Sequence, residues 1–404
     1  MSGFKDINNC NNHKRFSMRV FSVWRKELMH INKTRDNHFR LFGRYFDLTL
    51  VVYGVSGPHI SDDGTKIVRI NTFFKGLLGY MEFYIRALYY FVRIHRKDPY
   101  DFVLSPIGEE PIGRLISLFA RPRLQLVYDL WDIPGGSLTN YKYDAKEFAR
   151  KIYNIVLKSI LRKGDVIISG IVSEGLRSFH IPSSKVIVTE NGVLLDVFNP
   201  LLYEANTSMW TGGEGIIRLL YIGYLHEKRG GSDLLDVMLH LRSKNIQCEL
   251  LMVGPSDIDA MNSLIAGRNE RDLRSIVFFH EEISSDRIPG IILGADICLC
   301  PLDDIEKYRW SYPVKIYEYL ALGRAVVASR LPGIETLIRH EYNGLLYEAG
   351  NVQSLENEIC KLVDDELREN ISKNARESVM NKDWDKVVGD LAYALSCKVS
   401  ASAH

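Results

Sequence analysis

The chain has 404 residues, a length that favours two domains over one. Apolar residues make up 46% and charged residues 25%, as in ordinary soluble proteins, and the formal net charge of +1 argues against a general affinity for nucleic acid. The six cysteines form neither a disulfide framework nor a zinc spacing, so we expect reduced thiols and a cytoplasmic location. Residues 1–17 are polar and rich in asparagine, which predicts a disordered tail without a secretory signal.

Short apolar runs alternate with helical patterns through the first half of the chain, which predicts a parallel α/β sheet. The predicted strands begin at Met18, Leu48, Asp101, Leu124, Asp165 and Lys185. The predicted helices between them cover about 37–46, 73–95, 111–120, 144–162 and 173–179. The strands are apolar along almost their whole length, as expected for parallel strands that are covered on both faces.

The segment 73–95 is the one candidate for membrane contact. It contains Lys75, Glu82, Arg86 and Arg93, and Glu82 and Arg86 stand at a favourable i,i+4 spacing, so a spanning helix is not expected. We favour a helix that is buried on most faces between a sheet and its neighbours. The alternative is a partly exposed aromatic and basic surface that rests on a membrane, and recovery of all the protein in the soluble fraction at low salt would count against it.

The alternation restarts after a turn-rich segment, 201–215, that we predict to be an interdomain linker. The predicted strands of the second half begin at Ile217, Cys248, Ile276, Ala295, Ala325 and Gly344, and an amphipathic helix from Asp383 ends the chain. The sequence therefore predicts two Rossmann-like α/β domains, 18–205 and 206–382, whose parallel sheets face each other across a cleft. Ligands of such sheets bind at the carboxyl ends of the strands.

The segment Ser311–Ser329 predicts a helix over 314–322 followed by a strand. Lys315 lies in the first helical turn and Glu318 lies one turn later on the same side. A lysine at a helix N-terminus opposes the macrodipole, but an incoming anion is stabilised both by the lysine and by the unpaired N–H groups. This arrangement predicts a phosphate site with a hydroxyl-binding acid beside it.

A second phosphate site is predicted at 223–231, where a strand, a glycine-containing turn and a helix N-terminus follow one another. Lys228 and Arg229 add positive charge to this turn. A diphosphate needs donors that converge from several elements, which Lys315 and this turn can provide together. The segment matches neither the dinucleotide fingerprint nor the P-loop, so neither of those sites is supported.

Five segments in this order and spacing resemble the glycosyltransferase family 4 group of GT-B nucleotide-sugar transferases. They are NGVLLDVFNP, YIGYLHEKRGG, ADICLCP, PVKIYEYLALGRAVVAS and NGLLYE, and the match covers roughly Val172 to the C-terminus. The resemblance implies a GT-B fold in which the first domain binds the acceptor and the C-terminal helix, 383–404, crosses back to it.

The resemblance also implies site residues on the donor side. Arg229 matches the second member of a basic pair that grips the donor diphosphate, and Glu318 matches the acid that binds the nucleotide ribose. Val314 and Lys315 match positions that face the phosphate and the donor sugar. The expected donor-binding set is Gly223, Tyr224, Lys228, Arg229, Gly230, Val314, Lys315 and Glu318.

The sequence departs from the family pattern at two positions. Tyr224 stands where the first basic residue is common, so Lys228 or Lys315 must supply that charge. Trp310 stands where the first acid of the Glu-x7-Glu pair is expected, and that acid is usually assigned to the donor sugar. A subgroup with Ser-x-Pro-x-Lys before a single Glu resembles this chain, so the change does not by itself indicate inactivity.

The acceptor side is less clearly marked. Asp129, Trp131 and Asp132 follow one another near the end of a central strand, and Asp129 either positions the acceptor or sugar or caps the next turn. Glu109 and Glu110 precede a helix, where capping is favoured over contact with the acceptor. Asp303 and Asp304 are adjacent in a polar loop and are expected to be solvated, and His280 to be packed or solvated, so no metal site is predicted.

The predicted function is a metal-independent glycosyltransferase that uses a nucleotide-diphospho-sugar and no further cofactor, and the family resemblance implies that it retains the anomeric configuration. Arg229, Lys315 and Asp129 are the predicted catalytic residues, with a glycan or a lipid-linked acceptor at the inner face of the cell membrane, as in bacterial surface glycan assembly. A GT-B-like binding protein without turnover is the main alternative, because of Tyr224 and Trp310. A sugar phosphorylase or synthase and an NAD-dependent oxidoreductase are weaker alternatives, and the latter lacks a glycine-rich fingerprint.

Overall fold

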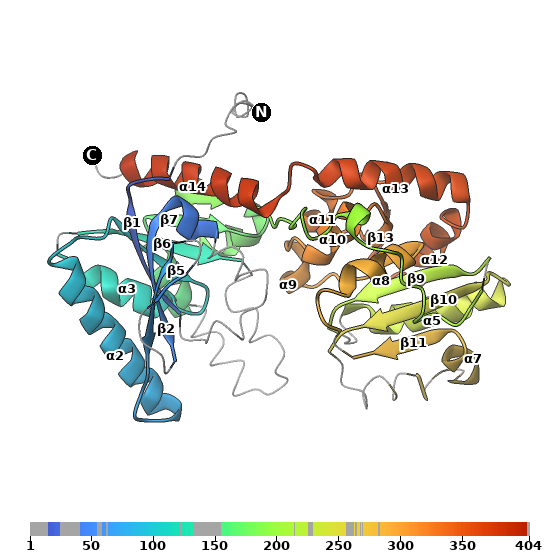
Figure 1. Cartoon of the computed structure of the whole chain (residues 1–404), viewed down its shortest axis with the longest axis horizontal. Helices are drawn as coiled ribbons and strands as arrows, with labels where there is room; N and C mark the ends of the chain where they lie inside the picture. The colour runs from blue at the N-terminus through green and yellow to red at the C-terminus, as the bar shows by residue number, and fades with distance from the viewer. Residues whose placement is uncertain are drawn as a thin grey trace. The chain divides into compact units, whose positions relative to one another are not determined.

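The computed structural model describes residues 15–24, 41–54, 59–61, 64–121, 123–131, 155–213, 215–224, 229–255, 262, 265–266, 268, 270–281 and 283–401. The chain divides into two compact units (Figure 1). The first unit combines Met1–Glu190 with Trp384–His404, and the second is Asn191–Asp383. This division falls at Asn191, whereas the sequence placed the boundary after residue 205.

The first unit is built on an eight-stranded sheet with the order β3-β4-β2-β1-β5-β6-β7-β8. Its strands are β1 Arg19–Trp24, β2 Asp47–Tyr53, β3 His59–Ile60, β4 Lys66–Ile70, β5 Phe102–Pro106, β6 Gln125–Leu130, β7 Val166–Ser169 and β8 Val186–Val188. Neighbouring strands are parallel except for the pair β3 and β4. All six predicted strands are confirmed, and β3 and β4 were not predicted.

Helices α2 (Gly76–His95) and α3 (Glu110–Phe119) pack beside one another in the first unit (Figure 1). The predicted helix at 173–179 is a 3-10 helix, and parts of the helices predicted at 37–46 and 144–162 lie outside the described residues. The terminal helix α14, Trp384–Ala401, contacts β7 and β8, and the Gln125 side chain donates a 2.7 Å hydrogen bond to Val399 O.

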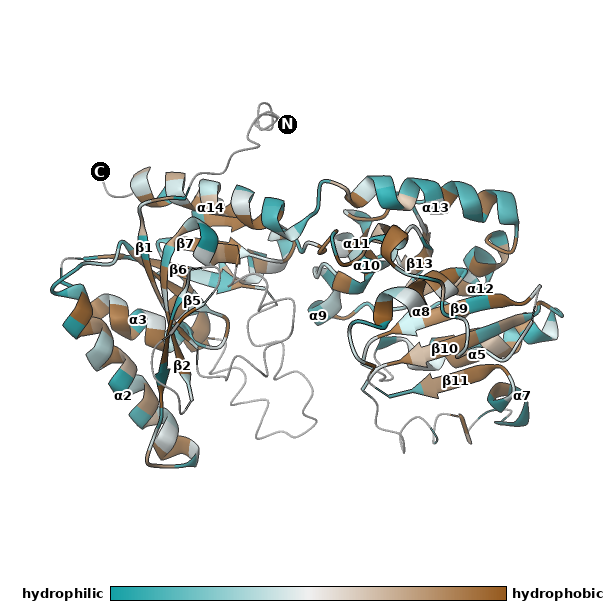
Figure 2. Ribbon diagram, viewed as in Figure 1, coloured by the Kyte–Doolittle hydropathy of each residue, from teal (hydrophilic) through white to brown (hydrophobic). Residues whose placement is uncertain are grey.

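Helix α2 differs from the predicted helix that is buried on most faces. Its buried residues recur at every fourth position and are Gly79, Phe83, Ala87, Phe91 and His95. This stripe packs toward β4 and α3, and the Phe91 ring lies 5.0 Å from the Phe21 ring. The prediction is wrong because only this stripe of α2 is fully buried, while other hydrophobic residues of the helix are exposed. Figure 2 shows the apolar residues of α2 in brown.

The second unit is built on a six-stranded parallel sheet with the order β11-β10-β9-β12-β13-β14. Its strands are β9 Ile217–Ile222, β10 Cys248–Val253, β11 Val277–His280, β12 Ile297–Cys300, β13 Ala325–Ser329 and β14 Leu345–Tyr347. Its helices are α5 Gly231–Ser243, α7 Glu270–Arg274, α8 Ile288–Gly294, α9 Glu306–Arg309, α10 Val314–Ala321, α11 Pro332–Glu335, α12 Val352–Lys361 and α13 Asp365–Val379. The predicted strands are confirmed, and they contribute buried residues to the core of this unit.

The segment predicted to be an interdomain linker is packed onto the second unit. Thr211 and Gly212 donate backbone hydrogen bonds of 2.9 and 3.0 Å to the buried Glu249 carboxylate, and the Trp210 indole donates to Leu219 O. A Cβ atom on Gly294 would lie 2.3 Å from Asn206 O, which shows how closely this segment approaches α8. The segment therefore belongs to the fold of the second unit.

Both sheets have a point where the strand order reverses direction. In the second unit it lies between β9 and β12, and in the first unit between β1 and β5. Ligands of doubly wound sheets bind beyond the carboxyl ends of the strands at this point, because the helices on either side leave in opposite directions. These two edges are therefore where binding residues are sought.

Candidate functional site

Two glycines end neighbouring strands at the carboxyl edge of the second sheet. Gly223 follows β9 and Gly254 follows β10, and both have a φ of 145°. A Cβ atom on Gly254 would lie 2.1 Å from Gly223 O, and one on Gly223 would lie 2.9 Å from Lys315 Nζ. The absence of side chains lets the two turns touch and lets a cation reach the edge of the sheet.

Lys315 is the cation that occupies this place. Its Nζ atom lies 3.9 Å from the centre of the Tyr221 ring, is buried, and has no hydrogen-bond partner among the residues that the structure describes. Burial removes the ammonium from water, and a ring face replaces only part of the lost hydration. The position therefore suits an anion that brings negative charge to Lys315.

The helices α5 and α10 both begin without a side-chain cap. Their N-cap residues are Gly230 and Pro313, neither of which has a side chain that accepts a hydrogen bond. By contrast, Asn351 and Asp364 cap α12 and α13 by accepting from Ser354 N at 3.0 Å and Leu367 N at 2.9 Å. The first amides of α5 and α10 are thus left for water or a ligand, and they add to the positive potential at this edge.

Glycine is required at the start of α5. Gly230 has a φ of 78°, and a Cβ atom there would lie 1.8 Å from Pro301 O. The start of α5 is therefore pressed against the turn that follows β12. This contact also places Arg229, the residue before it, near the end of β12.

The positive charges of Arg229 and Lys315 both influence the buried thiol of Cys300. Burial raises the pKa of Cys300 at the end of β12, and the charges of Lys315 and Arg229 both oppose this rise. The Arg229 guanidinium also lies 5.4 Å from the centre of the Tyr308 ring. The structure thus brings together the two cations that the sequence predicted to converge, while Lys228 lies outside the described residues.

Three side chains that the sequence analysis did not single out hold this edge in place. The Ile222 N–H donates a 2.9 Å hydrogen bond to the Tyr319 hydroxyl of α10, at a point where the pairing of β9 with β12 includes only Leu219 and Leu220. Burial raises the pKa of Tyr319 well above its usual value, so the phenol stays neutral. Tyr319 therefore fastens the helix that carries Lys315 to the strand that carries Gly223.

The other two side chains fix the adjoining loops. The Tyr221 hydroxyl donates a 3.1 Å hydrogen bond to Tyr224 O, and the Asn191 side chain donates a 2.5 Å hydrogen bond to Tyr312 O just before α10. Buried tyrosine hydroxyls usually have a hydrogen-bond partner. The occurrence of Tyr221 and Tyr319 within apolar segments was therefore the feature of the sequence that could have indicated their roles.

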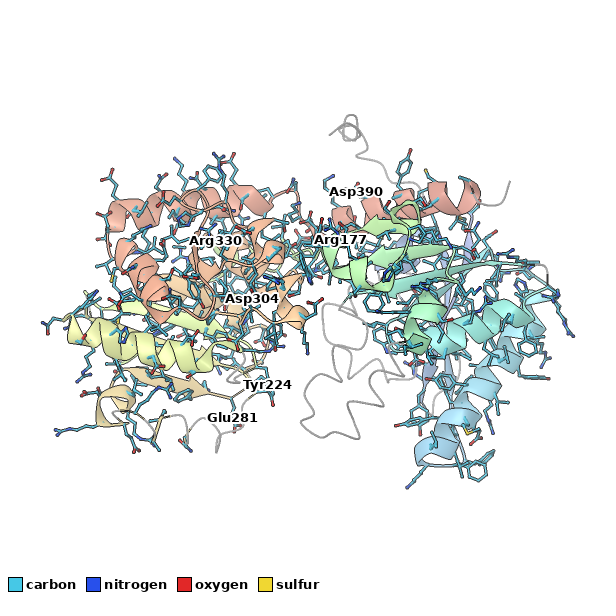
Figure 3. All side chains as sticks on the ribbon, turned by 180° about the vertical axis from the view of Figure 1, so that it is seen from behind. Arg177, Tyr224, Glu281, Asp304, Arg330 and Asp390 are labelled. Carbon is cyan, nitrogen blue, oxygen red and sulfur yellow. The ribbon has the colours of Figure 1, made fainter. Side chains whose placement is uncertain are left out.

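The remaining donor-side predictions lie around this edge. Val314 and Glu318 are partly buried residues of α10, and Glu318 lies one turn after Lys315. Tyr224 is exposed, and Figure 3 labels it together with Glu281 and Asp304, which follow β11 and β12. The Trp310 indole Nε1 is buried without a hydrogen-bond partner among the described residues.

No group of three or more potential metal ligands occurs in the described part of the chain. Asp304 pairs instead with Arg309 at 3.0 Å on the exposed side of the loop. His280 is exposed at the end of β11. The Asp304 and His280 side chains are thus exposed to solvent.

The carboxyl edge of the first sheet collects buried acids. Pro106 at the end of β5 stands opposite Asp129 of β6, and Ile107 N donates to Asp129 O at 2.9 Å. Glu109 accepts a 2.6 Å hydrogen bond from the Tyr84 hydroxyl, and Glu110 accepts a 2.9 Å hydrogen bond from Gly108 N. Asp129, Glu109 and Glu110 thus lie at one edge of the sheet, all three are buried, and burial raises the pKa of Glu110.

Trp131 lies one residue beyond this strand and packs against the terminal helix. Its ring centre lies 5.9 Å from that of Trp384, and a Cβ atom on Gly170 would lie 2.5 Å from the Trp131 ring. Asp132 lies outside the described residues. The contact gives Trp131 a packing role within the first unit, and a role toward an acceptor stays a prediction.

The similarity to a known family in sequence lies within the second unit. Residues 217–365 match the model of the family described as Glycosyl transferases group 1. The amylovoran biosynthesis glycosyltransferase AmsK of Erwinia amylovora is 28% identical over 190 residues, which cover 46% of this chain and 44% of AmsK. An Escherichia coli UDP-Gal:alpha-D-GlcNAc-diphosphoundecaprenol alpha-1,3-galactosyltransferase is 21% identical over 210 residues, 51% of this chain and 52% of the enzyme.

The similarity in structure extends over both units. The Anabaena protein HepE, solved in complex with UDP and glucose, superposes with a TM-score of 0.70 at 16% identity and covers 94% of this chain and 100% of its own. The chain matches about half the length of its curated relatives. These matches confirm the GT-B fold and the resemblance to glycosyltransferases, while the subgroup without the first acid stays a prediction.

Proposed function

We propose that this chain, whose residues 217–365 match the model of the group 1 glycosyl transferases, transfers a sugar from a nucleotide-diphospho-sugar to an acceptor hydroxyl. The observation that carries the proposal is the buried Lys315 ammonium, which lies beside Gly223 with no hydrogen-bond partner among the described residues. Arg229 and the uncapped starts of α5 and α10 surround the same edge. Together they suit a ligand with at least two adjacent negative charges.

In the proposed reaction the bond between the anomeric carbon and the diphosphate oxygen breaks, and its electron pair remains on the leaving diphosphate. The acceptor hydroxyl oxygen forms the new bond to the anomeric carbon, and the hydroxyl proton passes to the departing diphosphate. Lys315, Arg229 and the first amides of α5 and α10 stabilise the charge that accumulates there. These groups are held before the reaction begins, so no reorganisation of water is needed. The proposal assigns this role to protein cations and therefore needs no metal ion.

The nucleotide part of the donor is assigned to Glu318. Its place one helical turn beyond Lys315 suits a carboxylate that accepts hydrogen bonds from the ribose hydroxyls while the diphosphate meets the helix start. Lys228 is proposed to add a further charge to the diphosphate. Transfer with retention of configuration is proposed from the family resemblance, and the anomeric configuration of the product, measured by NMR, tests it.

The acceptor is proposed to be a glycan or lipid-linked saccharide of bacterial surface glycan synthesis. The name of the E. coli relative specifies a diphosphoundecaprenol-linked acceptor, and that of AmsK specifies amylovoran biosynthesis. The carboxyl groups of Asp129, Glu109 and Glu110 suit hydrogen bonds from acceptor or sugar hydroxyls. Neutral hydroxyls, unlike phosphates, are not repelled by such an edge.

The experiment begins with the purified chain and a panel of nucleotide sugars, each tested for a rise in melting temperature. The donor that binds is then incubated with polyprenyl-diphosphate-linked saccharides, and release of nucleoside diphosphate is measured. Arg229→Ala and Glu318→Ala should each weaken donor binding by about tenfold or more, since each removes a charged hydrogen bond. Unchanged binding in both variants would falsify the site assignment.

A binding protein without turnover is the second candidate, favoured by Tyr224 and Trp310 at positions where a base and an acid are common. It predicts a rise in melting temperature with a nucleotide sugar but no release of nucleoside diphosphate with any acceptor. Release above the rate of spontaneous hydrolysis decides for the transferase.

A further inference from the structure

Helix α2 has two apolar faces, of which the protein covers one. The covered face is the stripe Phe83, Ala87 and Phe91 with its neighbours one turn away. Leu77, Met81, Ile85 and Tyr89 repeat at the same four-residue spacing but are displaced by two positions, or by about 200° around the helix. The second stripe therefore lies on nearly the opposite side of α2.

The second stripe is open to solvent. Leu77 is 74% exposed, Ile85 65% and Tyr89 67%. Phe73 and Phe74 extend the stripe before the helix, and Leu118 and Phe119 at the end of the neighbouring α3 are also exposed. Isolated apolar side chains are normal on a protein surface, whereas a continuous group of this kind marks a contact surface.

The exposed phenylalanines at the start of α2 are held in place. The amides of Phe73 and Phe74 donate hydrogen bonds of 2.8 and 3.1 Å to the Glu82 carboxylate, which also pairs with Arg86 at 2.7 Å. The Arg86 guanidinium lies 5.0 Å from the centre of the Phe73 ring. The turn that presents the two rings is therefore fixed to the helix.

The charge along this surface is mainly positive. Residues 71–98 contain five Lys or Arg residues and two acids. Glu82 is occupied by the contacts above, and Asp98 pairs with Arg19 at 2.8 Å. Lys75 and Arg93 are exposed and lie on the same flank of α2, eighteen residues or five turns apart. Arg96 and Lys97 are exposed immediately after the helix.

We propose that this face of α2 docks on the surface of an anionic lipid bilayer. The apolar stripe enters the boundary between headgroups and acyl chains, and the basic flank meets the anionic headgroups. The covered stripe keeps α2 attached to its sheet, so the helix lies along the surface. None of the helices in the described residues is long and apolar enough to cross a membrane. The inference does not depend on the proposed transfer.

The test is flotation of the full chain with vesicles, without nucleotide sugar, so that its failure leaves the proposed transfer untouched. We expect the chain to bind vesicles of phosphatidylglycerol and phosphatidylethanolamine, and to bind phosphatidylcholine vesicles at least tenfold more weakly. Added salt should weaken binding to the phosphatidylglycerol-containing vesicles. Equal binding to both vesicle types, or no binding to either, overturns the proposal.

Matched variants locate the surface. Leu77→Ser/Ile85→Ser should lower binding at least tenfold, whereas Leu201→Ser/Leu202→Ser, which changes two leucines of the second unit that are 89% and 61% exposed, should leave it unchanged. Lys75→Glu/Arg93→Glu should weaken binding severalfold, whereas Arg271→Glu on α7 should not. Circular dichroism and melting temperature confirm that each variant is folded.

Self-association is the competing use of this face. If the parent chain forms dimers in sedimentation experiments and Leu77→Ser/Ile85→Ser abolishes them while neither protein binds vesicles, the face joins two copies of the chain and the proposal is overturned. A monomeric parent that binds anionic vesicles supports it.

Discussion

The carboxyl edges of the two sheets have opposite chemistry. In the first unit Glu109 is the N-cap residue of α3 and Glu110 its first residue, and the Glu110 carboxylate accepts from the Gly108 amide just before the helix. In the second unit α5 and α10 begin at Gly230 and Pro313, which leave their first amides without side-chain acceptors. At the edge of the first sheet, a backbone amide is thus bonded to a carboxylate of the same unit. At the edge of the second sheet, the first amides of two helices and two cations remain for a ligand. Two sheets of the same α/β architecture can therefore suit different ligands, because a few residues in the turns after the strands determine the chemistry of each edge.

Lys315→Ala should give the largest effect, because it removes the buried cation from the phosphate-binding edge. We expect kcat/KM to fall by about 10²–10³, comparable with the loss of one preorganised donor to a developing negative charge. Steady-state release of nucleoside diphosphate measures it. Lys373→Ala, at an exposed lysine of α13, is the control and should match the parent. A loss shared by both variants would point to a general effect on folding.

Gly223→Ala should have the next largest effect. Its Cβ atom would lie 2.9 Å from Lys315 Nζ at a φ of 145°, so both the turn and the lysine must shift. We expect donor affinity to fall about tenfold, measured by calorimetric titration of a nucleotide sugar. Gly350→Ala has a φ of 75° and nothing within 4 Å of the new atom, so it introduces backbone strain alone. Equal loss of affinity in both variants would contradict the contact with Lys315.

Glu110→Gln tests the acidic edge through stability. Burial raises the pKa of Glu110, so the folded chain holds this proton more tightly than the unfolded chain, and stability declines as pH rises through the raised value. Glutamine carries no such charge. We therefore expect the variant to melt a few degrees above the parent at pH 8, with the difference closing as pH falls toward about 4. A variant that melts below the parent at pH 8 would show that the Gly108 amide requires a charged acceptor.

A chelator should have the smallest effect. Since the proposed stabilisation comes from Lys315, Arg229 and helix amides, excess EDTA should leave the rate of transfer within about twofold of the untreated rate. A large loss of activity with EDTA that added Mg²⁺ or Mn²⁺ restores would contradict this prediction. It would show that a metal ion, and not the protein cations alone, stabilises the leaving diphosphate.

Most of the fold was predictable because the parallel strands are nearly continuous apolar runs. The strands β3 and β4 were missed because β3 has two residues and β4 is a five-residue strand in which Lys66 and Arg69 interrupt the apolar run. The burial of α2 was predicted incorrectly because its two apolar stripes have the same spacing. A sequence pattern shows that a face is apolar but not whether another element covers it.

Those residues of the candidate site were predictable whose positions depend on the local order of a strand, a turn and a helix. A strand, a glycine turn and a helix start identified Gly223, Arg229 and Lys315. The role of Tyr319 was not predictable, because it depends on where β12 stops pairing with β9, and that is a property of the assembled sheet. Asn191 is similar, since its partner, Tyr312 O, is distant in sequence.

The bond between Ile222 N and the Tyr319 hydroxyl has a use in solution. We expect this amide proton to exchange with deuterium when α10 and β9 separate locally, because its acceptor belongs to a fully buried side chain of α10. The exchange rate of a single amide therefore reports how often the helix that carries Lys315 detaches. It gives the opening equilibrium of the donor edge without any substrate.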